Sequence, residues 1–420
     1  LRRRPGVRQT TDALDGVRVL DLSQGAAGPT CGMALGDLGA TVIKVEPPDG
    51  EWGRGLGPPF VSGVAAAFLG MNRNKRGIAV DLKHAEGAEV VLRLAESCDV
   101  AIESFRPGVA DRLGIGFEVM AERNVRLVYA SVSAFGQEGP WRDRPGVDGI
   151  AQAMGGLMSI TGTADGPPVK VGIPAADMAA GAYATQAILA ALLARERTGL
   201  GQRVEVSLLD SALAFQAMPI SMYLADEQVP KRLGSAAAYS APNQAYATAD
   251  GHLMVAAYAP KRWTALCEVL EIPELETDPR FDTNEHRVHN RWELAEVLES
   301  VFRTKTTAAW VELLDAADII CGPLLSYPEL LAADHVREGG SLGTVVHPVV
   351  GKITSPAFPG RLHGSDRGTS LPPPFEPGEH SREILGECGI SDREIDRFVR
   401  DGIVAAPGEQ VRFESPFIEE

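Results

Sequence analysis

The sequence predicts an α/β protein, an open doubly wound parallel sheet, joined to a smaller α+β domain and a C-terminal segment that returns to the larger domain. Three observations support this fold class. Strand-like and helix-like runs alternate through the first half of the chain, the pattern changes near residue 226, and proline and glycine become frequent after residue 345. We expect a large domain over 1–225, a small domain over 226–332 and the returning segment over 333–420.

The large domain opens with a βαβ unit. A strand is expected at 17–22, a glycine-rich turn follows at 25–29, and a helix runs from residue 30 to a glycine at 39. The later elements of this domain are expected at 41–45, 78–82, 84–96, 100–103, 127–132, 177–194, 203–208 and 210–224. Because helices separate most of these strands, the strands are expected to pair in parallel.

The small domain has shorter elements. Its strands are expected at 244–247 and 252–257, and its helices at 261–270, 287–302 and 306–317. The returning segment contains the extended prolines 372–374 and one further helix at 381–388. This last helix is expected to pack on the large domain.

Charge and cysteine content exclude several classes of function. The formal charge of −16 over 420 residues argues against a nucleic acid partner, because phosphate neutralisation dominates such binding. An anionic ligand would need locally placed arginine and lysine. The five cysteines are scattered without a C-x-x-C pair, so neither a metal site nor a disulfide framework is predicted. We expect a reduced, cytoplasmic protein.

Neither a membrane span nor an ordered start is expected. The longest apolar run, 177–194, is interrupted by polar residues and is typical of a buried helix in a soluble protein. No membrane partner is therefore predicted. The basic residues within 1–12 are interpreted as an arm that does not pack.

Asp177 stands at the head of this apolar helix, and two roles are open to it. Pro174 just upstream and the Thr198-Gly199 pair downstream are ordinary start and stop signals. In a structural role, Asp177 would only cap the helix by accepting hydrogen bonds from exposed amides. In a chemical role, a carboxylate beside helix-head amides, with small alanine and glycine neighbours, would act as a covalent nucleophile.

A dinucleotide site is not supported. Glu46 follows the second strand where a ribose-binding acid would lie. However, a G-x-G-x-x-G motif that begins at Gly25 would require glycine where the chain has Ala27 and Thr30.

Two other segments carry anion-binding chemistry. Residues 71–77 place three cations and two amides immediately before a strand. Ser104 and Arg106 follow the end of another strand, with Arg112 soon after. Because ligands bind beyond the carboxyl ends of parallel strands, Ser104 and Arg106 are well placed to hold phosphate. The alternative is a solvated basic turn.

Many motifs, in one order, resemble the family III coenzyme A transferases. The similar stretches are 14–23, 27–29, 36–46, 72–76, 102–109, 134–140, 198–202 and 378–385. Formyl-CoA:oxalate and carnitine CoA-transferases belong to this family, and α-methylacyl-CoA racemase shares its fold.

The resemblance implies that Asp177 is a nucleophile that attacks an acyl-CoA thioester and passes through an anhydride and an aspartyl-CoA thioester. It implies an acyl-CoA donor, a carboxylic-acid acceptor, an interlocked homodimer, and coenzyme A as substrate rather than a permanent cofactor. The implied CoA contacts are Gln24, Gly25, Ala26, Ala27, Met71, Asn72, Arg73, Asn74, Lys75, Arg76, Ser104, Phe105, Arg106 and Arg112.

The acceptor side departs from the family pattern. The place of a glycine run is taken by 240–244, so oxalate is not the expected acceptor, and Asp148, Asn243 and Gln244 are the acceptor-side candidates. A 2-methylacyl-CoA racemase and a non-catalytic acyl-CoA-binding homologue remain alternatives. The racemase would need a histidine to work with its aspartate, and residues 146–148 contain none.

Overall fold

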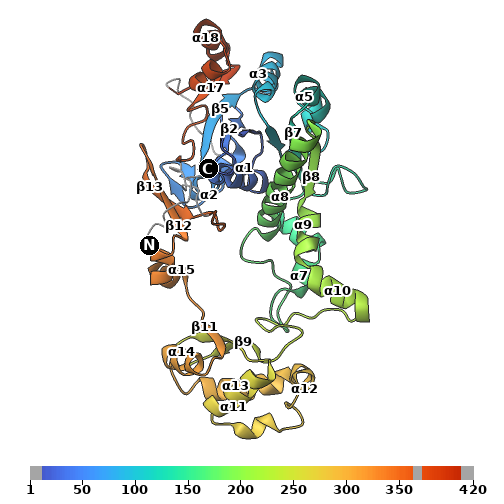
Figure 1. The fold of residues 1–420 in the computed structure, drawn as a ribbon, viewed down its shortest axis with the longest axis vertical. Coiled ribbons are helices and arrows are strands. Elements are labelled where there is room, and N and C mark those ends of the chain that lie inside the picture. Colours follow the sequence, from blue (N-terminus) through green and yellow to red (C-terminus); the bar gives the residue numbers. More distant parts are fainter. Residues whose placement is uncertain (1–11, 363–370, 408–420) are drawn as a thin grey trace. The chain divides into compact units, whose positions relative to one another are not determined.

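The computed structural model describes residues 12–362 and 371–407 (Figure 1). The predicted basic arm therefore lies, apart from Asp12, outside the described residues. The chain divides into two compact units, and the first contains the described parts of 1–155, 172–218 and 340–420. The second unit contains 156–171 and 219–339, so it includes the expected small domain and an additional stretch before Asp177.

A seven-stranded sheet forms the centre of the first unit. Its order is β14-β5-β2-β1-β6-β7-β8, and all pairs are parallel except β14 with β5. The strands are β1 (Arg18–Asp21), β2 (Thr41–Glu46), β5 (Lys75–Val80), β6 (Val100–Glu103), β7 (Val128–Ser133), β8 (Arg203–Ser207) and β14 (Val404–Ala405). This arrangement confirms the predicted fold class.

Helices cover both faces of the sheet. Side chains alternate between the two faces along each strand, so a strand that is apolar throughout contributes to a core on each face. Val19 packs into one core and Leu20 into the other. The Val19 face is covered by α1 (Ala27–Asp37), α6 (Asp148–Met154), α8 (Ala175–Thr198) and α9 (Leu208–Phe215). The Leu20 face is covered by α3 (Ala85–Glu96), α5 (Phe117–Arg123), α17 (Ser381–Glu387) and α18 (Asp392–Arg400).

The order of the strands creates a switch point between β1 and β6. From β1 the chain continues through β2 to β5 on one side, whereas β6, β7 and β8 extend the sheet on the other. The loops that leave the carboxyl ends of β1 and β6 therefore diverge, which opens the crevice where ligands bind in sheets of this kind.

The first unit also has elements that the sequence did not predict. Besides α5, α6, α18 and β14, they are η1 (Trp52–Gly55), β3 (Phe60–Val61), β4 (Val64–Ala65), α2 (Ala66–Met71), α4 (Val109–Arg112), β12 (Leu342–His347) and β13 (Gly351–Pro356). The hairpin of β12 and β13 lies where only an irregular segment was expected. The predicted return of the C-terminal segment is confirmed, since α17 and α18 pack into the core on the Leu20 face.

The second unit is built around a three-stranded antiparallel sheet of order β11-β10-β9, with its own hydrophobic core. Its elements are α7 (Leu157–Ile160), β9 (Asn243–Ala247), β10 (His252–Ala256), α11 (Pro260–Val269), η2 (Pro273–Glu276), α12 (Asn284–His289), α13 (Arg291–Phe302), α14 (Thr307–Ala316), β11 (Ile320–Pro323), α15 (Tyr327–Ala332) and α16 (Asp334–Glu338). The helix expected at 287–302 is interrupted at Asn290.

The helix expected at 210–224 is also interrupted. It is divided into α9 and α10 (Ala217–Asp226), which are bent by 69°. Pro219 explains the bend, because proline has no N–H to donate to the carbonyl of Phe215 and its ring clashes with that carbonyl.

One described helix, α8, is long and apolar enough to cross a membrane, and the bent pair of α9 and α10 passes the same test. The test concerns length and composition only. Half of the most apolar window of α8 is buried inside the protein.

Candidate functional site

The loops at the switch point are joined by hydrogen bonds. The Gln24 amide, just after β1, donates to Ser104 Oγ at 2.8 Å. Ser104 Oγ, just after β6, donates in turn to the Gln24 carbonyl at 3.2 Å. Two of the predicted site segments, 24–27 and 104–106, are therefore brought together at the carboxyl edge of the sheet.

The head of α1 follows directly from the first of these segments. Ala27 and Gly28 are the first residues of α1, so their N–H groups have no acceptor within the helix. The Thr30 amide is the first that bonds back along the chain, to the Ala26 carbonyl. Amide donors and the positive end of the helix dipole are thus concentrated at the turn.

Helix α8 crosses this region closely because it carries a glycine at the crossing point. A Cβ added to Gly181 would lie 2.8 Å from the Ala27 carbonyl oxygen and 3.1 Å from Thr30 Cβ. Asp177 precedes Gly181 by one turn, about 6 Å along the axis. The candidate nucleophile is therefore held near the 24–27 turn.

The cap of α8 comes from Asp148 and not from Asp177. Asp148 Oδ1 accepts the Ala176 N–H at 2.9 Å, and Asp148 Oδ2 accepts from Gln152 Nε2 at 2.8 Å. Within the described residues, the carboxylate of Asp177 has no hydrogen bond or ion pair. A cap supplied from elsewhere in the chain leaves the Asp177 oxygens free for chemistry.

The environment of Asp177 disfavours its charged form. Burial raises the pKa of Asp177 to about 7, and the neighbouring carboxylate of Asp148 contributes to the rise. A carboxylate with a raised pKa is more basic and less well solvated than an exposed one, and both properties favour nucleophilic attack.

The second loop presents two arginines to solvent. Arg106 and Arg112 are exposed, and neither has an ion pair among the described residues. The start of the loop is held by Glu103, the last residue of β6, whose Oε2 accepts the Phe105 N–H at 2.7 Å. Burial raises the pKa of Glu103 to about 7. Arg106 and Arg112 therefore remain available to an anion beyond the carboxyl edge of the sheet.

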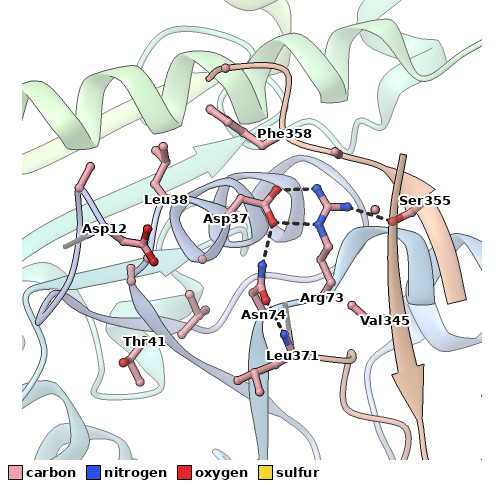
Figure 2. A pocket seen from close by; sticks show the side chains of 18 of the residues that line it. Asp12, Asp37, Leu38, Thr41, Arg73, Asn74, Val345, Ser355, Phe358 and Leu371 are labelled. Atoms are coloured by element: carbon pink, nitrogen blue, oxygen red, sulfur yellow. Dashed lines mark hydrogen bonds and ion pairs between the residues drawn. The ribbon is translucent and has the colours of Figure 1, made fainter. Parts of the chain in front are cut away.

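The basic run 71–76 lies differently from the other predicted contacts, because Lys75 is the first residue of β5 and the run leads into the amino end of that strand. Arg73 binds both Asp37 oxygens, with Nε to Oδ1 at 2.8 Å and Nη2 to Oδ2 at 2.5 Å (Figure 2). Asn74 Nδ2 donates to Asp37 Oδ1 at 2.8 Å. Asn74 Oδ1 accepts the Leu371 N–H at 2.7 Å. These side chains thus anchor the returning segment.

The place of Lys75 differs from the one expected for a residue that binds phosphate. Its side chain is fully buried, and its ammonium group donates to Asp21 Oδ2, the Pro29 carbonyl and Asn72 Oδ1 at 2.7 to 2.8 Å. An ammonium group has three N–H donors, and all three are used. The predicted phosphate contact is therefore replaced by a structural role, which a sequence cannot show because Asp21 lies 54 positions away.

The other members of the run also have protein partners. Arg76 pairs with Glu383 and Glu387 of α17 at 3.1 and 3.0 Å. Asn72 is buried and donates to the Phe68 carbonyl, while Met71 ends α2 and is partly exposed. A pocket of about 750 Å³ adjoins this region, lined by Asp37, Arg73, Thr41, Ser355 and Phe358 among others (Figure 2). Thr41 begins β2, so the pocket lies at the opposite end of the sheet from Gln24 and Ser104.

Asn243 and Gln244, the remaining acceptor-side candidates, begin β9 in the second unit. Asn243 Nδ2 donates to Ser240 Oγ at 3.0 Å. Across residues 12–362 and 371–407, no three histidine, cysteine or acidic side chains are grouped so that they could hold a metal ion.

Three residues that support the site were not among the predicted site residues. Gln152 donates to Asp148. Lys44 and Glu51 form an ion pair that bonds to the backbone of the turn after β1. Gln152 follows Asp148 by four residues, a spacing that brings two side chains together on a helix and could have indicated their contact. Lys44 and Glu51 carry no comparable signal, since their contacts depend on a loop between them.

Residues 14–381 match the family model for CoA-transferase family III. A succinyl-CoA:glutarate CoA-transferase of Mus musculus is 39% identical over 393 residues, covering 93% of this chain and 90% of that protein. A succinate–glutarate CoA-transferase of Agrobacterium fabrum (strain C58 / ATCC 33970) is 36% identical and covers 90% of this chain and 96% of that protein. The solved structure of a CAIB/BAIF family protein from Brucella suis is similar with a TM-score of 0.81 and 35% identity, covering 90% of this chain and 100% of that one.

Proposed function

The chain belongs to CoA-transferase family III and is a CoA-transferase, and on that premise we propose that Asp177 is its covalent nucleophile. The observation that carries the proposal is the position of Asp177, together with its lack of hydrogen-bond partners among the described residues. It lies at the head of α8 beside the switch-point turn, its capping role is taken by Asp148, and its pKa is raised to about 7.

The proposed reaction exchanges CoA without a net change in protons. An Asp177 oxygen attacks the carbonyl carbon of the acyl-CoA, the C–S bond breaks, and CoA leaves as a thiolate. The thiolate attacks the Asp177 carbonyl carbon of the resulting anhydride, which forms an aspartyl-CoA thioester and releases the donor acid. The acceptor carboxylate then repeats both steps in reverse, and Asp177 is regenerated.

Each attack develops negative charge on a carbonyl oxygen. The N–H groups of Ala27 and Gly28, at the head of α1, are suitable donors because no helical carbonyl occupies them. Arg106 and Arg112 would hold the phosphates of CoA by charge-assisted hydrogen bonds.

For the substrates, we propose succinyl-CoA as donor and glutarate as acceptor. The support is the names of two relatives, one at 39% and one at 36% identity, both covering most of this chain. A racemase has less support, since the stretch that contains Asp148 provides no histidine for a second proton transfer.

The test combines trapping with transfer. The parent protein, incubated with succinyl-CoA and hydroxylamine, should be modified at Asp177, because only an activated aspartyl carbonyl reacts in this way. Peptide mass spectrometry measures the modification. Asp177→Asn should lose transfer of CoA to glutarate by at least ~10⁴-fold, as expected when a covalent nucleophile is removed.

Lys83→Gln provides a matched control at an exposed position beyond β5. It should retain transfer. An unmodified parent together with an active Asp177→Asn variant would contradict the proposal. Transfer to other acids, with none to glutarate, would reject the substrate assignment while leaving the role of Asp177 intact.

A further inference from the structure

The turn after β1 is held by a buried ion pair. Lys44, in β2, and Glu51, just before η1, lie 3.0 Å apart, and neither side chain is exposed. Lys44 Nζ donates to the Ser23 carbonyl at 3.0 Å. Glu51 Oε2 accepts the Gly25 N–H at 2.7 Å. The pair therefore forms hydrogen bonds with the backbone on both sides of Gln24.

The conformation of the turn leaves little freedom next to this pair. Gly25 has φ +82°, a conformation that favours glycine. A Cβ at this position would lie 2.4 Å from a ring carbon of Trp52, the residue after Glu51. Glu51 thus accepts the Gly25 N–H, and the next residue, Trp52, packs against the Cα of Gly25.

A second pair extends the support to the returning segment. The Glu51 N–H donates to Glu46 Oε2 at 3.1 Å, and Arg54 binds both oxygens of Glu46 at 2.6 Å. Arg54 also donates to the carbonyls of Pro374 and Phe375. The position of Glu51 is therefore determined from both ends of the chain.

The Lys44 ammonium group keeps its charge inside the protein. Burial alone would lower the pKa of Lys44, but the carboxylates of Glu51, Asp21 and Glu46 outweigh burial and hold that pKa above its ordinary value. A buried ion pair adds little net stability, because desolvation offsets the attraction between the charges. A pair of hydrophobic residues at these positions could not form the hydrogen bonds to the Ser23 carbonyl and the Gly25 N–H.

We propose that Lys44 and Glu51 are positioning residues for the transfer reaction, which hold the 24–27 turn and the head of α1 in the geometry that the reacting thioester requires. The inference rests on the proposed function, because it assigns the turn to the reacting centre. A displacement of about 1 Å at such a centre can reduce the rate about 10²-fold.

The experiment compares two double variants that leave no unpaired charge. Lys44→Met with Glu51→Leu removes both backbone hydrogen bonds. Lys44→Met with Glu51→Gln keeps an acceptor for the Gly25 N–H. The control is Arg195→Met, which breaks another largely buried ion pair, to Asp99, near the far end of α8.

We expect the Leu variant to lose about 10- to 100-fold in kcat for transfer, with a much smaller change in KM for acyl-CoA. The Gln variant should recover much of that kcat. Thermal melting should show that Arg195→Met loses at least as much stability as the Leu variant, because it leaves Asp99 without its partner, while Arg195→Met keeps its kcat.

Equal kcat in the Leu variant and the parent would overturn the proposal, as would equal kcat in the Leu and Gln variants. If the Leu variant does not fold, the Gln variant must still be slower than the parent, because the Ser23 carbonyl has lost its donor. Failure of the proposed function is distinguishable, since the parent would then transfer CoA without modification of Asp177.

Discussion

At the scale of single residues, the arrangement separates two roles that the sequence left open for one aspartate. Asp148 caps α8 and Asp177 is left unbonded among the described residues. The two carboxylates then interact through charge, which contributes to the raised pKa of Asp177. The capping residue thus also influences the reactivity of the nucleophile.

This interaction predicts a pH profile. A nucleophilic Asp177 must be ionised, so kcat/KM should rise with pH through about 7 and reach a plateau above it. Asp148→Asn keeps an oxygen for the Ala176 N–H but removes the charge, which lowers the pKa of Asp177 and moves the inflection to lower pH. Initial rates between pH 5 and 9 measure both profiles. Coincident inflections would show that the charge of Asp148 does not act on Asp177.

Single residues were predictable where position along a strand decides their place. Ser104 and Gln24 follow strands whose apolar pattern is clear, so the carboxyl edge of the sheet could be assigned from the sequence. Lys75 was not predictable in this way. A lysine side chain spans several ångströms, and only the folded chain shows that it ends at Asp21.

At the scale of elements, the crossing of α1 and α8 is the contact that brings Asp177 to the turn. Gly181→Ala would improve intrinsic helix propensity by up to ~1 kcal/mol. The added Cβ would nevertheless meet the Ala27 carbonyl at 2.8 Å and separate the helices, and overpacking of this kind costs ~1 to 3 kcal/mol. We therefore expect a lower Tm and a lower kcat.

Gly386→Ala in α17 is the matched control for this crossing. No atom lies within 4 Å of the Cβ that it would add, so its Tm should be unchanged or higher and its kcat should equal that of the parent. Thermal melts and initial rates compare the two variants. A Gly181→Ala variant as stable and as active as the parent would show that the crossing has room to spare.

Most elements of the sheet and its long helices could be predicted, because their hydrophobic periods are strong. The failures have local causes. Pro219 divides a helix whose apolar pattern is continuous, and the hairpin of β12 and β13 is formed by a segment whose proline and glycine content suggested irregular structure. The hydrophobic period of the sequence shows neither the break at Pro219 nor the pairing of β12 with β13.

At the scale of the whole molecule, we propose a homodimer. No residue of α10 is buried, and Met218, Tyr223 and Leu224 expose large apolar surfaces. Contiguous apolar surface of this kind supports association with a second copy. Sedimentation should give a mass of about twice 44.6 kDa.

Leu224→Asp should shift the sedimentation equilibrium toward the monomer, because a charge would be buried at the interface. Val125→Asp, at an exposed apolar site outside α10, should not. A parent that sediments as an active monomer would contradict the proposed dimer.

The pairing of β14 with the edge of β5 imposes an order on biosynthesis. The sheet of the first unit acquires its last strand only when residues 404–405 have been made, whereas residues 219–339 of the second unit leave the ribosome earlier. Domains fold largely as they emerge. Until residues 404–405 have been made, β5 is therefore an open edge of the sheet, and an unpaired edge of this kind can pair with another chain.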